Sequence, residues 1–162
     1  MFVELLRPKQ IYKSILDIPL EQLYNNGIRG IIIDLDNTLT EWNSSELSRQ
    51  TLNWLRRAEE IGLRLCFVSN NSDERVRKIA EMVGVPFVAR ARKPRRRSFI
   101  RAMELMRTGR EETAVVGDQI FTDILGGNRL GLFTILVTPL SKREFIGTRF
   151  MRLLERLVLY ER

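Results

Sequence analysis

The sequence contains no histidine and only one cysteine, and each scarcity excludes a class of chemistry. Without histidine there is no Ser-His-Asp triad, no phosphohistidine and no zinc site of the His/Cys type. A lone thiol cannot form an internal disulfide, which suits a reducing compartment. A cysteine-based phosphatase would need an arginine six positions after its cysteine, and Ser72 stands six after Cys66. We therefore predict that Cys66 is a buried strand residue.

Long apolar runs are also missing. No stretch approaches the ~18 residues of a membrane-spanning helix, and the first nine residues lack the basic start and sustained apolar run of a signal peptide. We therefore expect a cytoplasmic protein. Acidic residues are outnumbered, since 27 Lys and Arg face 20 Asp and Glu, for a net charge of +7. This excess predicts attraction to phosphorylated metabolites, nucleic acid or an anionic membrane, without choosing among them.

Short β-branched segments alternate along the chain with segments of helical periodicity. Residues 30–34 show no polar alternation, as expected of a strand buried on both faces. The alternation predicts an α/β fold with a doubly wound, Rossmann-like parallel sheet, in a single domain of 162 residues. The expected strands are 30–34, 63–68, 85–89, 113–117 and 133–137, and the expected helices are 44–61 (capped by Ser44 or Ser45), 72–83, 94–106, 122–130 and an amphipathic 148–160. We expect residues 1–28 to form an N-terminal extension.

Polar clusters follow four of the expected strands. In chain order they are Asp34-Leu35-Asp36-Asn37-Thr38, Ser69-Asn70-Asn71, Lys93-Pro94, and Gly117-Asp118 through to Asp123. Ligands of doubly wound sheets bind at the carboxyl ends of the strands. We therefore expect the four clusters to converge on one site.

The residue types in these clusters favour phosphoryl-transfer chemistry. Asp34, Asp36 and Asp118, with Asp123 as a weaker candidate, repel one another unless cations neutralise them. Hard carboxylate oxygens without histidine or cysteine suit Mg²⁺. Lys93 adds a fixed positive charge, while small donors after the second strand can hold the oxygens of a tetrahedral anion. A metal, a cation and small donors around a carboxylate nucleophile form a phosphoryl-transfer site.

The four clusters resemble the four motifs of the haloacid dehalogenase (HAD) phosphohydrolases in residue type, order and spacing. Within that superfamily the chain resembles the YqeG-type subfamily, HAD-IIIA, because it is short and carries Arg7-Pro8-Lys9 and Ile15-Leu16-Asp17 before the first motif. The mitochondrial phosphatidylglycerophosphate phosphatases are similar to that subfamily. The resemblance implies a Mg²⁺-dependent phosphatase that works through an aspartyl-phosphate intermediate.

The resemblance also implies a role for each motif residue. Asp34 would be the nucleophile, and Asp36 would act first as general acid and then as general base. Lys93 would stabilise charge on the nucleophile and on the phosphate. The implied phosphate-binding residues are Thr38, which also orients its loop, Ser69, Asn70 and Lys93.

The resemblance implies a metal site in the same place. Asp34, Asp118 and the backbone carbonyl of Asp36 would hold Mg²⁺. Asp123 would be either a direct ligand or one step removed from the ion and paired with Lys93. No motif residue is missing, so nothing in the sequence indicates an inactive enzyme.

The spacing of the motifs leaves no room for a cap domain. Between Asp36 and Ser69 there are 32 residues, and between Ser69 and Lys93 there are 23. An uncapped site excludes water poorly but admits a bulky substrate. We therefore expect a phosphomonoester on a lipid head group such as phosphatidylglycerophosphate, on a protein or on a nucleic-acid end.

Several motif residues have a simpler interpretation. Ser69 and Asn70 could cap the next helix, and Asp123 could be an ordinary acid in a first helical turn. Lys93 could be one member of a solvated basic run, because seven cations lie within residues 90–101. That run is either a solvated face or a rim that steers anions. Nucleic-acid binding is less favoured, because no aromatic residues interleave with the cations.

The expected last helix and the overall function also have open alternatives. Arg149, Arg152 and Arg156 flank an apolar stripe on this helix, formed by Phe150, Leu153, Leu154 and Leu157. The helix either packs on the core or a partner, or lies in an anionic membrane interface. Two other functions stay open: a basic RNA- or ribosome-associated module with incidental phosphatase activity, and a phosphotransferase.

Overall fold

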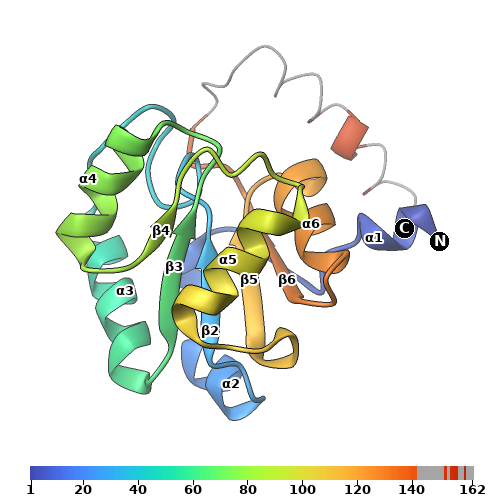
Figure 1. Cartoon of the computed structure of the whole chain (residues 1–162), viewed down its shortest axis with the longest axis horizontal. Helices are drawn as coiled ribbons and strands as arrows, with labels where there is room; N and C mark the ends of the chain where they lie inside the picture. The colour runs from blue at the N-terminus through green and yellow to red at the C-terminus, as the bar shows by residue number, and fades with distance from the viewer. Residues whose placement is uncertain (142–151, 153, 157–158, 160–162) are drawn as a thin grey trace.

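A six-stranded, all-parallel sheet forms the centre of the fold, as shown by a computed structural model that describes residues 1–141, 152, 154–156 and 159. The strand order is β1-β6-β5-β2-β3-β4. The strands are β1 (Gln10–Tyr12), β2 (Gly30–Ile33), β3 (Arg64–Val68), β4 (Phe87–Val88), β5 (Thr113–Gly117) and β6 (Phe133–Val137). Helices cover both faces of this sheet (Figure 1), so the predicted doubly wound α/β fold is confirmed.

One short helix precedes β1, and the other helices and helical turns connect successive strands. They are α1 (Phe2–Leu5), η1 (Ile15–Asp17), α2 (Leu20–Asn25), α3 (Arg49–Ile61), α4 (Asp73–Val83), α5 (Arg96–Met106), η2 (Arg110–Glu112), η3 (Ile120–Ile124) and α6 (Leu125–Asn128). The segment between the first two motifs holds α3 and its loops, and the next segment holds α4 and β4. Neither segment forms a separate cap.

Alternation of side chains along the buried strands divides the core into two layers. Ile31 and Ile33 of β2 pack with residues of α2, α3 and α4 on one face of the sheet. Ile32 points to the opposite face and packs with residues of α5. Figure 1 shows α5 in front of the central strands. Because helices cover both faces of the sheet, we expect a ligand to bind at an edge where the strands end.

The N-terminal extension contributes more to the fold than its sequence indicates. Residues 10–12 form β1, an edge strand that pairs with β6, so the prediction of five strands was one short. Ile15, Ile18, Leu20 and Leu23 of this extension are buried in the larger core cluster. A three-residue strand is too short to show a periodicity, and the sequence therefore gave no signal for it.

The predicted start of the 44–61 helix was wrong. The helix α3 begins at Arg49 and not near Ser44 or Ser45, and the Ser48 hydroxyl caps it by accepting a hydrogen bond from the Thr51 amide at 3.1 Å. At its other end, Gly62 adopts a left-handed φ of 107°. Helical spacing of apolar residues continues upstream into a loop, so the pattern alone does not locate the cap.

Three other boundaries also differ from expectation. The helix α5 begins at Arg96, where 94 was expected. The strand predicted at 85–89 is reduced to the two residues of β4. The helix predicted over 122–130 is instead the π-helical turn η3 followed by the short α6. None of these shifts moves a motif residue away from its strand end.

Part of the expected 148–160 helix is described. Arg152, residues 154–156 and Leu159 are helical. The predictions for Arg149, Phe150, Leu153 and Leu157 fall outside the described residues. Within the described part of the chain, no helix is long and apolar enough to cross a membrane.

The position of the α3 cap can be tested by substitution. Ser48→Ala should lower the free energy of unfolding by about 1 kcal/mol, because the Thr51 amide loses its acceptor. Ser44→Ala is the matched control, since among the described residues the Ser44 hydroxyl accepts only from the exposed Glu46 amide. Urea unfolding of both variants measures the difference. A larger loss from Ser44→Ala than from Ser48→Ala would contradict this helix boundary.

Candidate active site

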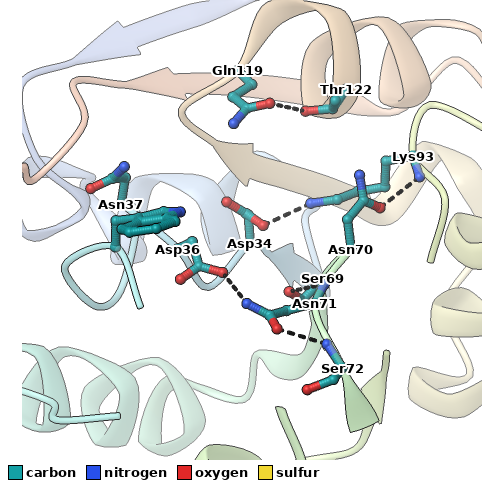
Figure 2. Close-up of a pocket in the computed structure, with 11 residues that line it drawn as sticks. Asp34, Asp36, Asn37, Ser69, Asn70, Asn71, Ser72, Lys93, Gln119 and Thr122 are labelled. Carbon is teal, nitrogen blue, oxygen red and sulfur yellow. Dashed lines mark hydrogen bonds and ion pairs between the residues drawn. The ribbon is translucent and has the colours of Figure 1, made fainter. Parts of the chain in front are cut away.

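The four sequence motifs converge at the carboxyl edge of the sheet. Asp34 directly follows β2, Ser69 follows β3 and Asp118 follows β5, while Lys93 comes from the loop between β4 and α5. These segments surround one pocket (Figure 2). Its lining residues are Asp34, Asp36, Asn37, Trp42, Ser69, Asn70, Asn71, Ser72, Lys93, Gln119 and Thr122.

Lys93 joins two motifs through buried ion pairs. Its Nζ lies 2.8 Å from Asp34 Oδ1 and 2.6 Å from Asp123 Oδ1. Burial lowers the pKa of the Lys93 ammonium, but the carboxylates of Asp123 and Asp34 outweigh burial and raise this pKa above its ordinary value. Lys93 is therefore charged, and its interpretation as part of a solvated run was wrong. Asp123 is likewise more than an ordinary first-turn acid.

Three buried carboxylates form a compact cluster. Asp34, Asp118 and Asp123 each offer an oxygen, and these oxygens lie within 4.8 Å of one another. Burial raises the pKa of Asp118 well above its ordinary value, and the negative charges of Asp34 and Asp123 add to this effect. Burial also raises the pKa of Asp123 to about 6, although Lys93 opposes it. The negative charge of this cluster is thus only partly balanced by nearby positive charge.

The donor set of this cluster fits a hard divalent cation. All three groups are carboxylates, which are the ligands that Mg²⁺ prefers. The Thr38 hydroxyl lies 3.2 Å from Asp118 Oδ1 and 3.4 Å from Asp34 Oδ2, so it links the two carboxylates. An added cation would offset the burial and the repulsion that together raise the pKa values of Asp118 and Asp123.

A glycine permits the close approach of Asp123 to the end of β5. A Cβ built on Gly117 would lie 2.2 Å from the Asp123 carboxyl carbon. Any side chain at position 117 would therefore displace Asp123 from Lys93. The glycine of the Gly117-Asp118 pair is accordingly a packing requirement of the site.

Asp36 occupies a different part of the pocket from the carboxylate cluster. Its Oδ2 accepts a hydrogen bond from Asn71 Nδ2 at 3.1 Å (Figure 2). Its Oδ1 accepts from the Asn43 amide at 3.1 Å and lies 2.6 Å from Arg75 Nη1. Three residues from three segments thus set the position of one carboxylate.

The residues after β3 do not act as helix caps. The N-cap of α4 is Ser72, so the capping interpretation of Ser69 and Asn70 was wrong. Ser69 is buried, and its hydroxyl accepts from the Asn71 amide at 3.1 Å. Asn70 Oδ1 accepts from the Lys93 amide at 2.8 Å, which fixes the loop that carries this lysine.

The lone cysteine takes no part in the site. Cys66 lies on β3 with its side chain buried in the α5 layer of the core, as predicted. Burial raises the pKa of its thiol to about 12. The thiol is therefore protonated near neutral pH and is a poor nucleophile.

The structure adds a contact from the last helix that the sequence did not predict. Arg152 forms an ion pair with the Asp118 carboxylate and also donates to the Asp118 carbonyl. Glu155 is buried and accepts from the Ile120 amide at 2.6 Å. Leu159 packs beside the cluster that contains Ile120. These described residues of the helix pack on the loop after β5, which favours the core-packing alternative.

Arg75 and Arg152 were both missed as site residues. Each lies in a helical segment that holds at least one other arginine, and nothing in the local pattern distinguishes it. For Arg75 the one available signal is its position one turn after Ser72, near the strand end. For Arg152 no such signal exists, because a contact with Asp118 spans 34 positions of the chain.

Comparison with known proteins shows which family the chain resembles. The family model of the mitochondrial PGP (phosphatidylglycerophosphate) phosphatases matches residues 3–140. The chain belongs to this family. The probable phosphatase YqeG of Bacillus subtilis is 41% identical over 152 residues, which cover 94% of this chain and 88% of that protein.

Two more distant similarities extend the comparison. The chloroplastic/mitochondrial phosphatidylglycerophosphate phosphatase 1 of Arabidopsis thaliana is 29% identical, over 90% of this chain but only 45% of that protein. A Legionella pneumophila structure assigned to HAD subfamily III A superposes with a TM-score of 0.54 at 17% identity, over 71% of this chain and 68% of that one. This superposition shows that the chain has the HAD fold, and its family membership identifies it as a phosphatase.

The raised carboxyl pKa values predict how stability depends on pH without metal. An unfolded aspartate has a pKa of about 3.9, whereas the pKa of Asp123 is about 6. Between these values the folded state binds a proton that the unfolded state has lost, so raising the pH destabilises the fold. In chelator, the melting temperature should fall on the order of 5 °C from pH 4 to pH 7.

The variant Asp123→Asn isolates this effect from other titrations. Thermal unfolding of parent and variant should show a smaller fall with pH in the variant. Millimolar Mg²⁺ should also reduce the fall in the parent, because the ion binds the folded carboxylates. Equal pH slopes in parent and variant would contradict the assignment of these carboxyl groups.

Proposed function

We propose that the protein hydrolyses phosphomonoesters through an aspartyl-phosphate on Asp34, with Mg²⁺ as cofactor. The observation that carries this proposal is the buried Lys93 bridge between Asp34 and Asp123 at the edge of the carboxylate cluster. Lys93 keeps charge balanced around Asp34, so this carboxylate can serve as an ionised nucleophile. Family membership supports phosphatase chemistry at the same residues.

In the first half-reaction, Asp34 attacks phosphorus. A new bond forms between an Asp34 carboxylate oxygen and phosphorus, while the bond from phosphorus to the ester oxygen breaks. Asp36 donates its proton to that departing oxygen, so the product leaves as an alcohol. Lys93 and the small donors around Ser69 hold the phosphoryl oxygens as charge shifts onto them.

In the second half-reaction, water attacks the aspartyl-phosphate. The water oxygen bonds to phosphorus, the bond from phosphorus to the Asp34 oxygen breaks, and inorganic phosphate leaves. Asp36, now ionised, takes the proton of the attacking water and returns to its starting state. Asp36 borders the pocket without joining the carboxylate cluster, which suits a group that exchanges protons with water and leaving group.

Asp34, Asp118 and the backbone carbonyl of Asp36 would hold Mg²⁺. When bound, the ion supplies positive charge that offsets the carboxylates and the phosphate. Since Asp123 already pairs with Lys93, we propose that Asp123 lies next to the metal site without binding the ion directly.

We also propose that the natural substrate is a bulky anionic phosphomonoester, such as phosphatidylglycerophosphate at a membrane surface. The open site and the names of the family and of the Arabidopsis relative support this. An arginine rim adjoins Lys93. Its members are exposed and make no ion pair with the described carboxylates: Arg90, Arg92, Arg95, Arg96 and Arg97.

The nucleophile is tested by Asp34→Asn. Turnover of p-nitrophenyl phosphate should fall by at least about 10³-fold, because a carboxamide is a poor nucleophile and a poor metal ligand. Asp17→Asn, at an exposed aspartate of η1, should leave turnover unchanged. Chelator should abolish parental activity, and added Mg²⁺ should restore it. Folded Asp34→Asn protein with activity within tenfold of the parent would exclude this mechanism.

The rim is tested by changing Arg95, Arg96 and Arg97 together to Gln. Each cation near an anionic surface contributes about 1 kcal/mol, so the apparent affinity for phosphatidylglycerophosphate in anionic vesicles should fall by about 100-fold at low salt. Hydrolysis of p-nitrophenyl phosphate should change little.

A control of matched charge exists at the opposite edge of the sheet. Lys9, Arg107 and Arg110 are exposed and precede the amino ends of β1 and β5. Changing these three to Gln should leave both activities near the parental values. If the two triple variants had equal effects on the vesicle substrate, the rim would have no specific role in substrate binding and would be only a solvated face.

A further inference from the structure

Arg75 is a largely but not fully buried cation beside the pocket, and it has no role in the reaction proposed above. It lies in the first turns of α4, and its side chain is 12% exposed. Its Nη1 is 2.6 Å from Asp36 Oδ1, and no other described basic side chain pairs with Asp36. Burial of an arginine is costly unless its charge is paired, so this contact is a specific feature of the fold.

The same guanidinium also holds the loop that carries Asp36. Its Nη2 donates to the Ser44 carbonyl and lies 3.4 Å from the Thr40 hydroxyl. Arg75 therefore contacts the segment from Asp36 to Ser44 at three points. Because α4 directly follows the second motif, this guanidinium connects the Asp36 loop to the helix after Ser69 and Asn70.

These contacts fix the orientation of the Asp36 carboxylate. Arg75 and the Asn43 amide bind Oδ1, while Asn71 binds Oδ2 at 3.1 Å. With both oxygens held, rotation about the bond to the carboxyl group is restricted. Asp36 is 21% exposed at its side chain, so a held carboxylate still faces the solvent of the pocket.

We propose that Arg75 is a positioning residue that orients Asp36 for proton transfer to the leaving group. This inference rests on the proposed function, in which Asp36 is the general acid. Proton transfer demands a short donor–acceptor distance in the reacting complex, and misplacement by about 1 Å costs roughly 100-fold in rate. A planar guanidinium contacts Asp36, Thr40 and Ser44 together, whereas a lysine ammonium is a point charge on a flexible stem.

Two aryl phosphates of similar shape distinguish positioning from a general loss of structure. p-Nitrophenolate is a good leaving group that needs little protonation, whereas phenolate is a stronger base and depends on the general acid. The measured quantity is kcat/KM, which reports the steps up to the first cleavage. For Arg75→Gln we expect kcat/KM to fall at least about tenfold more with phenyl phosphate than with p-nitrophenyl phosphate.

Two further variants complete the series. Arg75→Lys keeps the charge but cannot make all three contacts, so its selectivity for the better leaving group should lie between parent and Arg75→Gln. Arg77→Gln is the matched control, because Arg77 lies in the same helix, is exposed and pairs only with the exposed Asp73 at 3.9 Å among described acids. It should keep the parental ratio of the two substrates. Thermal unfolding checks that each variant folds.

Asp36→Asn separates failure of this inference from failure of the proposed function. A strong selectivity for p-nitrophenyl phosphate in Asp36→Asn, with the parental ratio in folded Arg75→Gln, would overturn only the positioning role. Parental ratios in both variants would overturn the general-acid role of Asp36 itself. If Arg75→Gln does not fold, the ratio in Arg75→Lys decides, and a parental ratio there overturns the proposal.

Discussion

Repulsion among carboxylates at one edge of the sheet is the constraint on which the site depends. Three buried aspartates each place a carboxylate oxygen within 4.8 Å of the others, and burial disfavours the ionised forms of Asp118 and Asp123. Lys93 compensates part of that charge by bridging Asp34 and Asp123, and Arg152 pairs with Asp118. The arrangement persists because the rest of the fold fixes the strand ends that carry it. Compensation by protein cations is incomplete, which is the condition under which a divalent ion binds such a cluster well.

The fold supplies the precision that this cluster needs. Adjacent parallel strands β2 and β5 bring Asp34 and Asp118 to the same edge, and Gly117 leaves space for Asp123 behind them. Asn70 ties the Lys93 loop to the end of β3. No separate cap covers this edge among the described residues, and in the proposed function charged residues outside the pocket help to bind a bulky anionic substrate. In the proposed function, the arginine rim would thus help to bind the same phosphomonoester that the site hydrolyses.

Much of this site could be predicted from the sequence, because its candidate catalytic residues lie in short motifs that follow buried strands. Strands such as β5 and β6 were located to the residue, since continuous β-branched runs bounded by polar residues are a strong local signal. The edge strand β1 was missed because three residues carry no period. The start of α3 was misplaced because apolar spacing extends beyond the Ser48 cap. Arg75 and Arg152 were missed for a different reason: their roles arise from contacts across 35 or so positions, which no local pattern records.

In the proposed reaction the phosphoryl group is bonded to Asp34 between substrate and product. Two successive in-line displacements at phosphorus restore its configuration, whereas direct attack by water inverts it. The most direct test is the stereochemical course of hydrolysis, measured with an ester of phosphate or thiophosphate made chiral by oxygen isotopes. A reaction through aspartyl-phosphate gives net retention of configuration at phosphorus. Net inversion would exclude this reaction, because a single displacement leaves no step in which Asp34 carries the phosphoryl group.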